Sequence, residues 1–175
     1  MSQRCVVLIG MMGAGKTGVG RALAETLGYE FVDTDKMVEK NTGKKIRRIF
    51  EDEGEARFRE YEIEAIASLK GATGKVIATG GGAFQAQENR IVFNNIGLTV
   101  YLKASARELF ARIKNDTSRP LLHTADPKAE IARLLEEREH NYESAVVVVD
   151  TEDLSVEEVV DHLIDELARR TLGDG

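Results

Sequence analysis

The sequence predicts an α/β protein, a three-layer sandwich in which helices cover both faces of a five-stranded parallel sheet. Short, β-branched apolar runs alternate with longer amphipathic stretches along the 175 residues, and glycine-rich turns follow the first and third of these runs. With 42% hydrophobic and 31% charged residues, the composition is that of a soluble globular domain. A chain of this length fits a single core, so we expect residues 1–175 to form one domain.

The first strand and the first helix have the clearest patterns. The run Cys5–Ile9 is short, apolar and followed by glycine, which is typical of a buried parallel strand. Residues Lys16–Leu27 carry apolar side chains at helical spacing, and Gly28 provides a stop signal. Cys5 is the only cysteine of the chain, so an internal disulfide is excluded, and its apolar surroundings indicate a core residue rather than a reactive thiol.

The remaining elements continue the alternation. We expect further strands at residues 31–32, 75–78, 98–102 and 146–149. We expect further helices at residues 36–41, 45–69 with a break near Gly54, 106–114, 128–141 and 155–171. The last of these helices begins with a capping-box signature, Ser155 followed by Glu158. Residues 115–127 hold both prolines of the chain among polar groups, so we interpret them as a loop.

Candidate functional residues follow the ends of three predicted strands. Gly10 follows the first strand, Asp33 and Asp35 follow the second, and Gly80–Gly82 follow the third. Ligands of open parallel sheets bind at the carboxyl ends of the strands. We therefore expect these distant parts of the chain to converge on one crevice.

Residues 10–17, Gly-Met-Met-Gly-Ala-Gly-Lys-Thr, match the phosphate-loop pattern G-x-x-x-x-G-K-[ST] between a predicted strand and a predicted helix. In such a loop the backbone N–H groups and the helix N-terminus point at phosphate oxygens. We expect Lys16 to bridge the β- and γ-phosphates of a nucleoside triphosphate as a catalytic residue, and the Thr17 hydroxyl to be a Mg²⁺ ligand. The predicted nucleotide-binding residues of the loop are Met12, Gly13, Ala14, Gly15, Lys16 and Thr17.

The phosphate loop alone does not separate a kinase from a switch GTPase or an ATPase. The chain contains no Asn-Lys-x-Asp element of the kind that GTPases use for guanine. Helicases and motors need a longer chain and a basic track for their polymer. The small size therefore favours a kinase that acts on a metabolite.

Charge and hydropathy argue against nucleic-acid and membrane partners. The 24 Lys and Arg residues against 30 Asp and Glu residues give a net charge of -6, which argues against a nucleic-acid partner. No apolar stretch approaches the ~18 residues of a membrane span, and the N-terminus has no signal-peptide core. We expect a cytoplasmic protein that binds neither membrane nor nucleic acid.

Five further motifs follow the phosphate loop in a fixed order. They are Asp33-Thr-Asp35, a Gly-x-x-x-Phe-Arg-x-x-Glu pattern at residues 54–62, Gly80–Gly82, Arg119-Pro-Leu-Leu122 and Arg138. With the phosphate loop, this ordered set resembles the shikimate kinase family from about Val7 to Asp150. The resemblance implies a P-loop fold like that of nucleoside monophosphate kinases. It also implies transfer of phosphate from ATP, with Mg²⁺, to shikimate, giving shikimate 3-phosphate in aromatic amino acid (chorismate) biosynthesis.

The resemblance implies an acceptor site formed by helices within residues about 36–70 and by the glycine turn. Two arginines would clamp the carboxylate of shikimate, because a guanidinium fork matches a carboxylate bidentately, and Glu62 would orient the first of them. Asp35 would accept hydrogen bonds from ring hydroxyls and act as a catalytic base toward the attacking one. The implied substrate-binding residues are Asp35, Arg59, Gly80, Gly81, Gly82 and Arg138.

The resemblance also implies roles around the nucleotide. Asp33 would hold Mg²⁺ through water, together with Thr17. Arg119 would lie on a lid at about residues 115–127 and would act as a catalytic, ATP-binding arginine finger in cis. Arg112 would lie against the adenine. The family further implies a monomer.

Each acceptor-side motif has an ordinary structural alternative. Taken alone, Asp33 or Asp35 would be a helix N-cap, and Arg59 or Arg138 would belong to a solvated, ion-paired helix face. Their occurrence in order with a phosphate loop favours the functional interpretation. After the second arginine the chain reads Glu139-His-Asn-Tyr142, where the family commonly has a proline.

Three other functions remain open at the level of sequence. A gluconate kinase of the same architecture would also need arginines for an acid. A relative that binds nucleotide without turnover is disfavoured by the presence of Lys16, Thr17, Asp33 and Asp35 together. A nucleotide-dependent switch would need partner binding gated by nucleotide, for which the sequence offers no sign.

Overall fold

The computed structural model describes residues 4–116 and 124–173, and its centre is a sheet of five parallel strands in the order β2-β3-β1-β4-β5. The strands are β1 (Cys5–Ile9), β2 (Glu30–Asp33), β3 (Lys75–Ala78), β4 (Gly97–Lys103) and β5 (Val147–Asp150). All residues of β1 are buried, as expected of a central strand covered on both faces. The predicted five-stranded parallel sheet is therefore confirmed.

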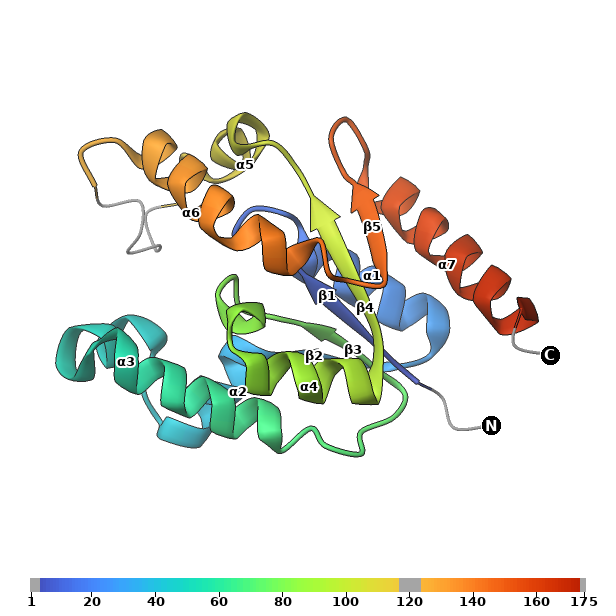
Figure 1. Ribbon diagram of the computed structural model, residues 1–175, viewed down its shortest axis with the longest axis horizontal. Helices are drawn as coiled ribbons and strands as arrows, with labels where there is room; N and C mark the ends of the chain where they lie inside the picture. The colour runs from blue at the N-terminus through green and yellow to red at the C-terminus, as the bar shows by residue number, and fades with distance from the viewer. Residues whose placement is uncertain (1–3, 117–123, 174–175) are drawn as a thin grey trace.

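Helices lie on both faces of this sheet. They are α1 (Lys16–Leu27), α2 (Thr34–Thr42), α3 (Ile46–Ala67), the 3₁₀ turn η1 (Ala83–Gln85), α4 (Gln87–Ile96), α5 (Ala106–Ile113), α6 (Pro127–Tyr142) and α7 (Val156–Gly173). Helix α1 packs against α7, whereas α4 and α6 are drawn in front of the sheet and α1 behind it (Figure 1). No helix in the described part of the chain has both the length and the apolar character to cross a bilayer.

The structure contains two elements, η1 and α4, in a segment for which the sequence patterns predict none. Helix α4 buries Val92, Phe93 and Ile96, which are at helical spacing, but it also buries the polar Asn89. The residue before the helix, Ala86, has no side chain that could cap it. A polar residue on the buried face and a missing cap together remove the two signals by which such a short helix is recognised.

Two helices begin earlier than predicted because an aspartate caps each of them. Helix α2 begins at Thr34, since the Asp33 carboxylate accepts hydrogen bonds from backbone N–H groups of the first turn. Helix α6 begins at Pro127, which the sequence patterns placed in the preceding loop. There Asp126 accepts from the N–H of Ala129 at 3.0 Å, and proline suits the first helical turn because its missing N–H is not needed.

Two predicted helix signals are confirmed. The Ser155–Glu158 capping box is formed in both directions: the N–H of Glu158 donates to Ser155 Oγ at 3.2 Å, and the N–H of Ser155 donates to Glu158 Oε2 at 2.8 Å. The predicted break in α3 is at Gly54, whose φ of 84° and ψ of 170° are non-helical. Across the break the rings of Phe50 and Phe58 are 4.8 Å apart, so the two halves of α3 pack together.

The arrangement leaves one edge of the sheet between two groups of helices. Helices α2 and α3 lie on one side of the carboxyl edge of the strands, and α5 and α6 lie on the other (Figure 1). The loops that follow β1, β2 and β3 are at this edge because the strands are parallel. The candidate residues of the sequence analysis are therefore found where these helices face each other.

Candidate active site

The phosphate loop connects β1 to α1 with a backbone that only glycine adopts readily. Gly10, Gly13 and Gly15 have φ values of 142°, 81° and 91°. A Cβ on Gly10 would lie 2.7 Å from the carbonyl oxygen of Leu102, so the loop also approaches β4 closely. The loop ends at Lys16, the first residue of α1, and its N–H groups therefore continue into a helix N-terminus.

Lys16 lies folded against this loop. Its Nζ donates hydrogen bonds to the carbonyl oxygens of Gly10 at 2.7 Å and Met11 at 2.8 Å, and the residue is 8% exposed. These two backbone carbonyls hold the ammonium group at the loop. Its position at the loop is the one that a phosphate-binding lysine requires.

The end of β2 is joined to the turn after β3. Asp33 Oδ1 accepts from the N–H of Asp35 at 2.9 Å and of Lys36 at 3.2 Å, so this residue is the N-cap that its position suggested. The buried Thr34 accepts a hydrogen bond from the N–H of Gly80 at 3.0 Å. This threonine, which sequence reasoning did not single out, fixes the distance between the aspartates and the glycine turn.

Two carboxylates meet above Gly80. A Cβ at this position would lie 2.6 Å from Asp35 Oδ1 and 3.1 Å from Glu62 Oε2, so a side chain here would displace the two carboxylates. Burial raises the pKa of Asp35, and the nearby charge of Asp33 adds to this rise, while Lys16 opposes it. The group is thus a better proton acceptor than an exposed aspartate.

Arg59 lies over the third glycine of the turn. Its guanidinium donates to Glu62 Oε1 at 2.9 Å and to Glu55 Oε1 at 3.1 Å. A Cβ on Gly82 would lie 2.6 Å from Cζ of Arg59, so only glycine leaves room for the guanidinium here. The predicted pairing of Arg59 with Glu62 is present.

Glu62 is far more buried than a surface ion pair would require. Its side chain is 1% exposed, and burial raises its pKa, although the charge of Arg59 opposes the rise. Within the described part of the chain, Oε2 has no hydrogen-bond partner. A carboxylate in this position stabilises the cationic form of Arg59 and keeps its guanidinium directed at the turn.

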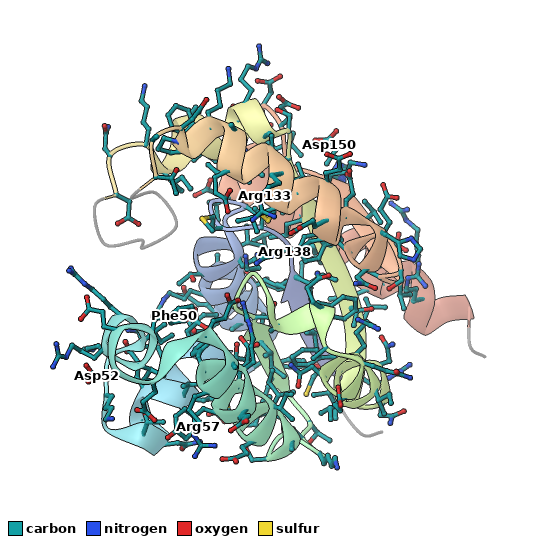
Figure 2. All side chains as sticks on the ribbon, turned by 60° about the vertical axis from the view of Figure 1, so that its left-hand side comes forward. Phe50, Asp52, Arg57, Arg133, Arg138 and Asp150 are labelled. Carbon is teal, nitrogen blue, oxygen red and sulfur yellow. The ribbon has the colours of Figure 1, made fainter. Side chains whose placement is uncertain are left out.

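Arg138 approaches the same turn from α6, on the opposite side. Its Nη1 lies 3.9 Å from Met11 Sδ and would lie 3.6 Å from a Cβ on Gly81. Figure 2 shows this side chain pointing from α6 toward the middle of the molecule. One turn later the buried Tyr142 donates a hydrogen bond to the carbonyl oxygen of Gly81. Burial raises the pKa of Tyr142 to about 12, so the hydroxyl keeps the proton that it donates.

Of the two arginines expected beside the nucleotide, Arg112 lies within the described residues and contacts the phosphate loop. Arg112 donates to Glu108 at 2.9 Å, to the carbonyl oxygen of Gly13 at 3.4 Å and to the carbonyl oxygen of Thr151 at 3.0 Å. It therefore joins the phosphate loop to the segment after β5. Arg119 lies outside the described residues.

The metal candidates provide oxygen donors. Thr17 is exposed in the first turn of α1, and Asp33 presents a carboxylate at the end of β2. Among residues 4–116 and 124–173, no group of three or more His, Cys, Asp and Glu side chains is placed to hold a metal ion. One hydroxyl and one carboxylate fit Mg²⁺, which prefers oxygen ligands and usually completes its shell with water and phosphate oxygens.

The fold and the two halves of this crevice define the class of the protein, a P-loop small-molecule kinase. A family model described as shikimate kinase matches residues 12–168. The chain belongs to the shikimate kinase family.

Individual relatives support the same assignment. A shikimate kinase of Geobacter sulfurreducens is 47% identical over 157 residues, which cover 90% of this chain and 87% of the relative. The solved structure of shikimate kinase from Acinetobacter baumannii in complex with shikimate has a TM-score of 0.93 and 36% identity, covering 97% of this chain and 96% of that one. A gluconokinase from Sinorhizobium meliloti has a TM-score of 0.65 and 23% identity over 95% of this chain and 92% of its own, which shows a shared fold alone.

Proposed function

We propose that the chain transfers the γ-phosphate of ATP to the 3-hydroxyl of shikimate, with Mg²⁺, to give shikimate 3-phosphate for aromatic amino acid biosynthesis. The observation that carries the proposal is the glycine turn, which Arg59 and Arg138 approach from different helices while Asp35 lies above its first residue. Two guanidinium groups beside a carboxylate suit an acceptor that combines one acid group with several hydroxyls. Membership of the family identifies that acceptor as shikimate.

Each half of the crevice has a separate task. The N–H groups of the phosphate loop and Lys16 hold the β- and γ-phosphates, and Lys16 exchanges its bonds to Gly10 and Met11 for bonds to phosphate oxygens. Arg59 and Arg138 bind the acceptor carboxylate and so fix the ring. Positioning of the two reactants is the main catalytic contribution in phosphoryl transfer.

Asp35 receives the proton of the reaction. The attacking hydroxyl oxygen forms a bond to the γ-phosphorus, the bond from that phosphorus to the bridging oxygen of ADP breaks, and the hydroxyl proton passes to Asp35. Mg²⁺, held by Thr17 and through water by Asp33, would neutralise charge on the phosphates. The raised pKa of Asp35 favours its protonation during this step.

The remaining assignments belong to the proposal as well. Arg119, on a lid at residues 115–127, would offset charge on the transferring phosphoryl group, and Arg112 would lie against the adenine. We place all these parts in one kinase domain over residues 1–175, with acceptor helices at 36–70. We propose a cytoplasmic monomer.

The proposal is tested by an ADP-release assay with ATP, Mg²⁺ and a set of acceptors. Shikimate should give turnover well above the rate without acceptor, whereas gluconate and the methyl ester of shikimate should not, because the ester has no carboxylate for the two arginines. Lys16→Ala should abolish turnover. Turnover with gluconate but not with shikimate would contradict the acceptor while leaving the phosphate side intact.

A further inference from the structure

The two arginines of the acceptor site are held in different ways. Arg59 is oriented by its own ion pairs with Glu55 and Glu62. Arg138 has no ion pair within the described residues; its guanidinium lies 3.9 Å from Met11 Sδ and beside the hydroxyl of Tyr142, which is one turn further along the same helix. Its position therefore depends on where α6 lies relative to the glycine turn.

Helix α6 is fastened to that turn by side chains next to Arg138. Tyr142 donates to the carbonyl oxygen of Gly81. Asn141, three residues after Arg138, donates from Nδ2 to Gln85 Oε1 at 2.7 Å, a distance typical of a good hydrogen bond. The second bond joins α6 to η1, the element that directly follows the turn.

Gln85 is itself on a rigid support. Helix α4 holds η1 from its other side: Asn89 Nδ2 donates to the carbonyl oxygen of Ala83 at 2.9 Å, and Arg90 Nη1 donates to the carbonyl oxygens of Phe84 at 2.9 Å and Gln85 at 2.7 Å. A hydrogen bond from α6 to this segment therefore fixes α6 relative to the glycine turn. It is not a bond between two mobile surface side chains.

We propose that Gln85 and Asn141 form a positioning pair, which sets the guanidinium of Arg138 at the height above Gly81 needed to bind the acceptor carboxylate. The pair touches neither reactant and acts through Arg138. The inference rests on the proposed function, because it assigns Arg138 to the carboxylate of shikimate. It adds two residues, from η1 and α6, that affect acceptor affinity and leave the phosphate side unchanged.

The test compares Gln85→Ala, Asn141→Ala and the double variant with the wild type. Each single variant should raise the KM for shikimate about fivefold, the effect of one lost hydrogen bond between two half-buried side chains. The KM for ATP and kcat should stay within about twofold. The double variant should be no worse than the worse single one, since both changes remove the same bond. His140→Ala, an exposed neighbour on α6, is the matched control and should behave as wild type.

A second comparison shows whether the pair acts through Arg138. In an Arg138→Ala background, Asn141→Ala should leave kcat/KM for shikimate unchanged, because the group that it positions is gone. The same fivefold loss in that background, unchanged KM values in the single variants, or parallel increases of both KM values would overturn the proposal. Wild-type turnover with shikimate in the same assay separates this failure from failure of the proposed function itself.

Discussion

At the scale of single residues, the acceptor site keeps acidic groups in places that disfavour their charge. Glu62 is almost completely enclosed, and both it and Asp35 have a raised pKa whose largest cause is burial. The arginines that oppose this effect must themselves remain available for a substrate. The site is therefore organised for binding at some cost in stability.

This cost leads to a prediction for the pH dependence of stability. Because the pKa of Glu62 is raised in the folded state above its ordinary 4.5, the native protein binds this proton more tightly than the unfolded chain does. Stability from this group is then present below the ordinary pKa and is lost as the pH rises through the raised one. Glu62→Gln cannot ionise, so its melting temperature minus that of the wild type should increase from pH 4.5 to 7.5.

The control for this prediction is Glu55→Gln, which removes the other carboxylate that contacts Arg59 from an exposed position. Its difference from the wild type should change less over the same range. A difference for Glu62→Gln that stays constant or decreases with pH would show that burial does not govern this group.

The sequence predicts a contact of the site when the two contacting residues are close together in the chain, and it misses contacts between residues that are distant in the chain. The pair Arg59 and Glu62 could be predicted because the two residues are one helical turn apart. Two other hydrogen bonds could not be predicted: the N–H of Gly80 donates to Thr34, and the hydroxyl of Tyr142 donates to the carbonyl oxygen of Gly81. Both join residues that only the sheet topology brings together. The burial of Glu62 was missed for the same reason.

At the scale of elements, the break in α3 determines where Arg59 is presented. The conformation of Gly54 lies in a region that only glycine occupies readily, and it turns the second half of the helix so that Phe58 packs on Phe50. A Cβ at this position would meet nothing within 4 Å. The cost of a side chain would therefore be purely conformational.

We expect Gly54→Ala to lower stability by about 1–3 kcal/mol and to raise the KM for shikimate, with the KM for ATP unchanged. Relief of the strain would move Arg59 away from the glycine turn. Gly28→Ala, at the left-handed end of α1, should lower stability by about 1 kcal/mol without changing either KM. Thermal unfolding and steady-state kinetics measure both effects, and equal KM changes in the two variants would refute a specific role of the break.

Elements were predicted well where the local signal was complete. Strand β1 and helix α1 have the predicted bounds because an apolar run, a glycine turn and a terminal glycine mark them. Helix α4 was missed because Asn89 is buried to hold the carbonyl of Ala83, a contact that has meaning only in the folded structure.

At the scale of the whole molecule, the sheet order places two unrelated groups of residues at one edge. Strand β1 lies between β3 and β4, so the phosphate loop is next to the glycine turn. Helices α3 and α6 then bring Arg59 and Arg138 to that turn from different sides. The alternation of elements predicts the layers and a shared crevice at the carboxyl ends of the strands, whereas the strand order, which puts the phosphate loop beside the glycine turn, came only from the structure. We expect the two halves to be separable in function.

The measurement that tests this claim most directly is kcat/KM for shikimate in Arg59→Ala beside Arg57→Ala. Arg57 is on the same helix, pairs with Glu60 and lies over the ring of Tyr61, and Figure 2 places it away from Arg138. Arg59→Ala should lose about 100-fold in kcat/KM for shikimate, the cost of a charge-assisted bidentate contact, with the KM for ATP within about twofold. Arg57→Ala should match the wild type. Equal losses in both variants, or equal losses for shikimate and ATP in Arg59→Ala, would contradict the division of the crevice into a phosphate half and an acceptor half.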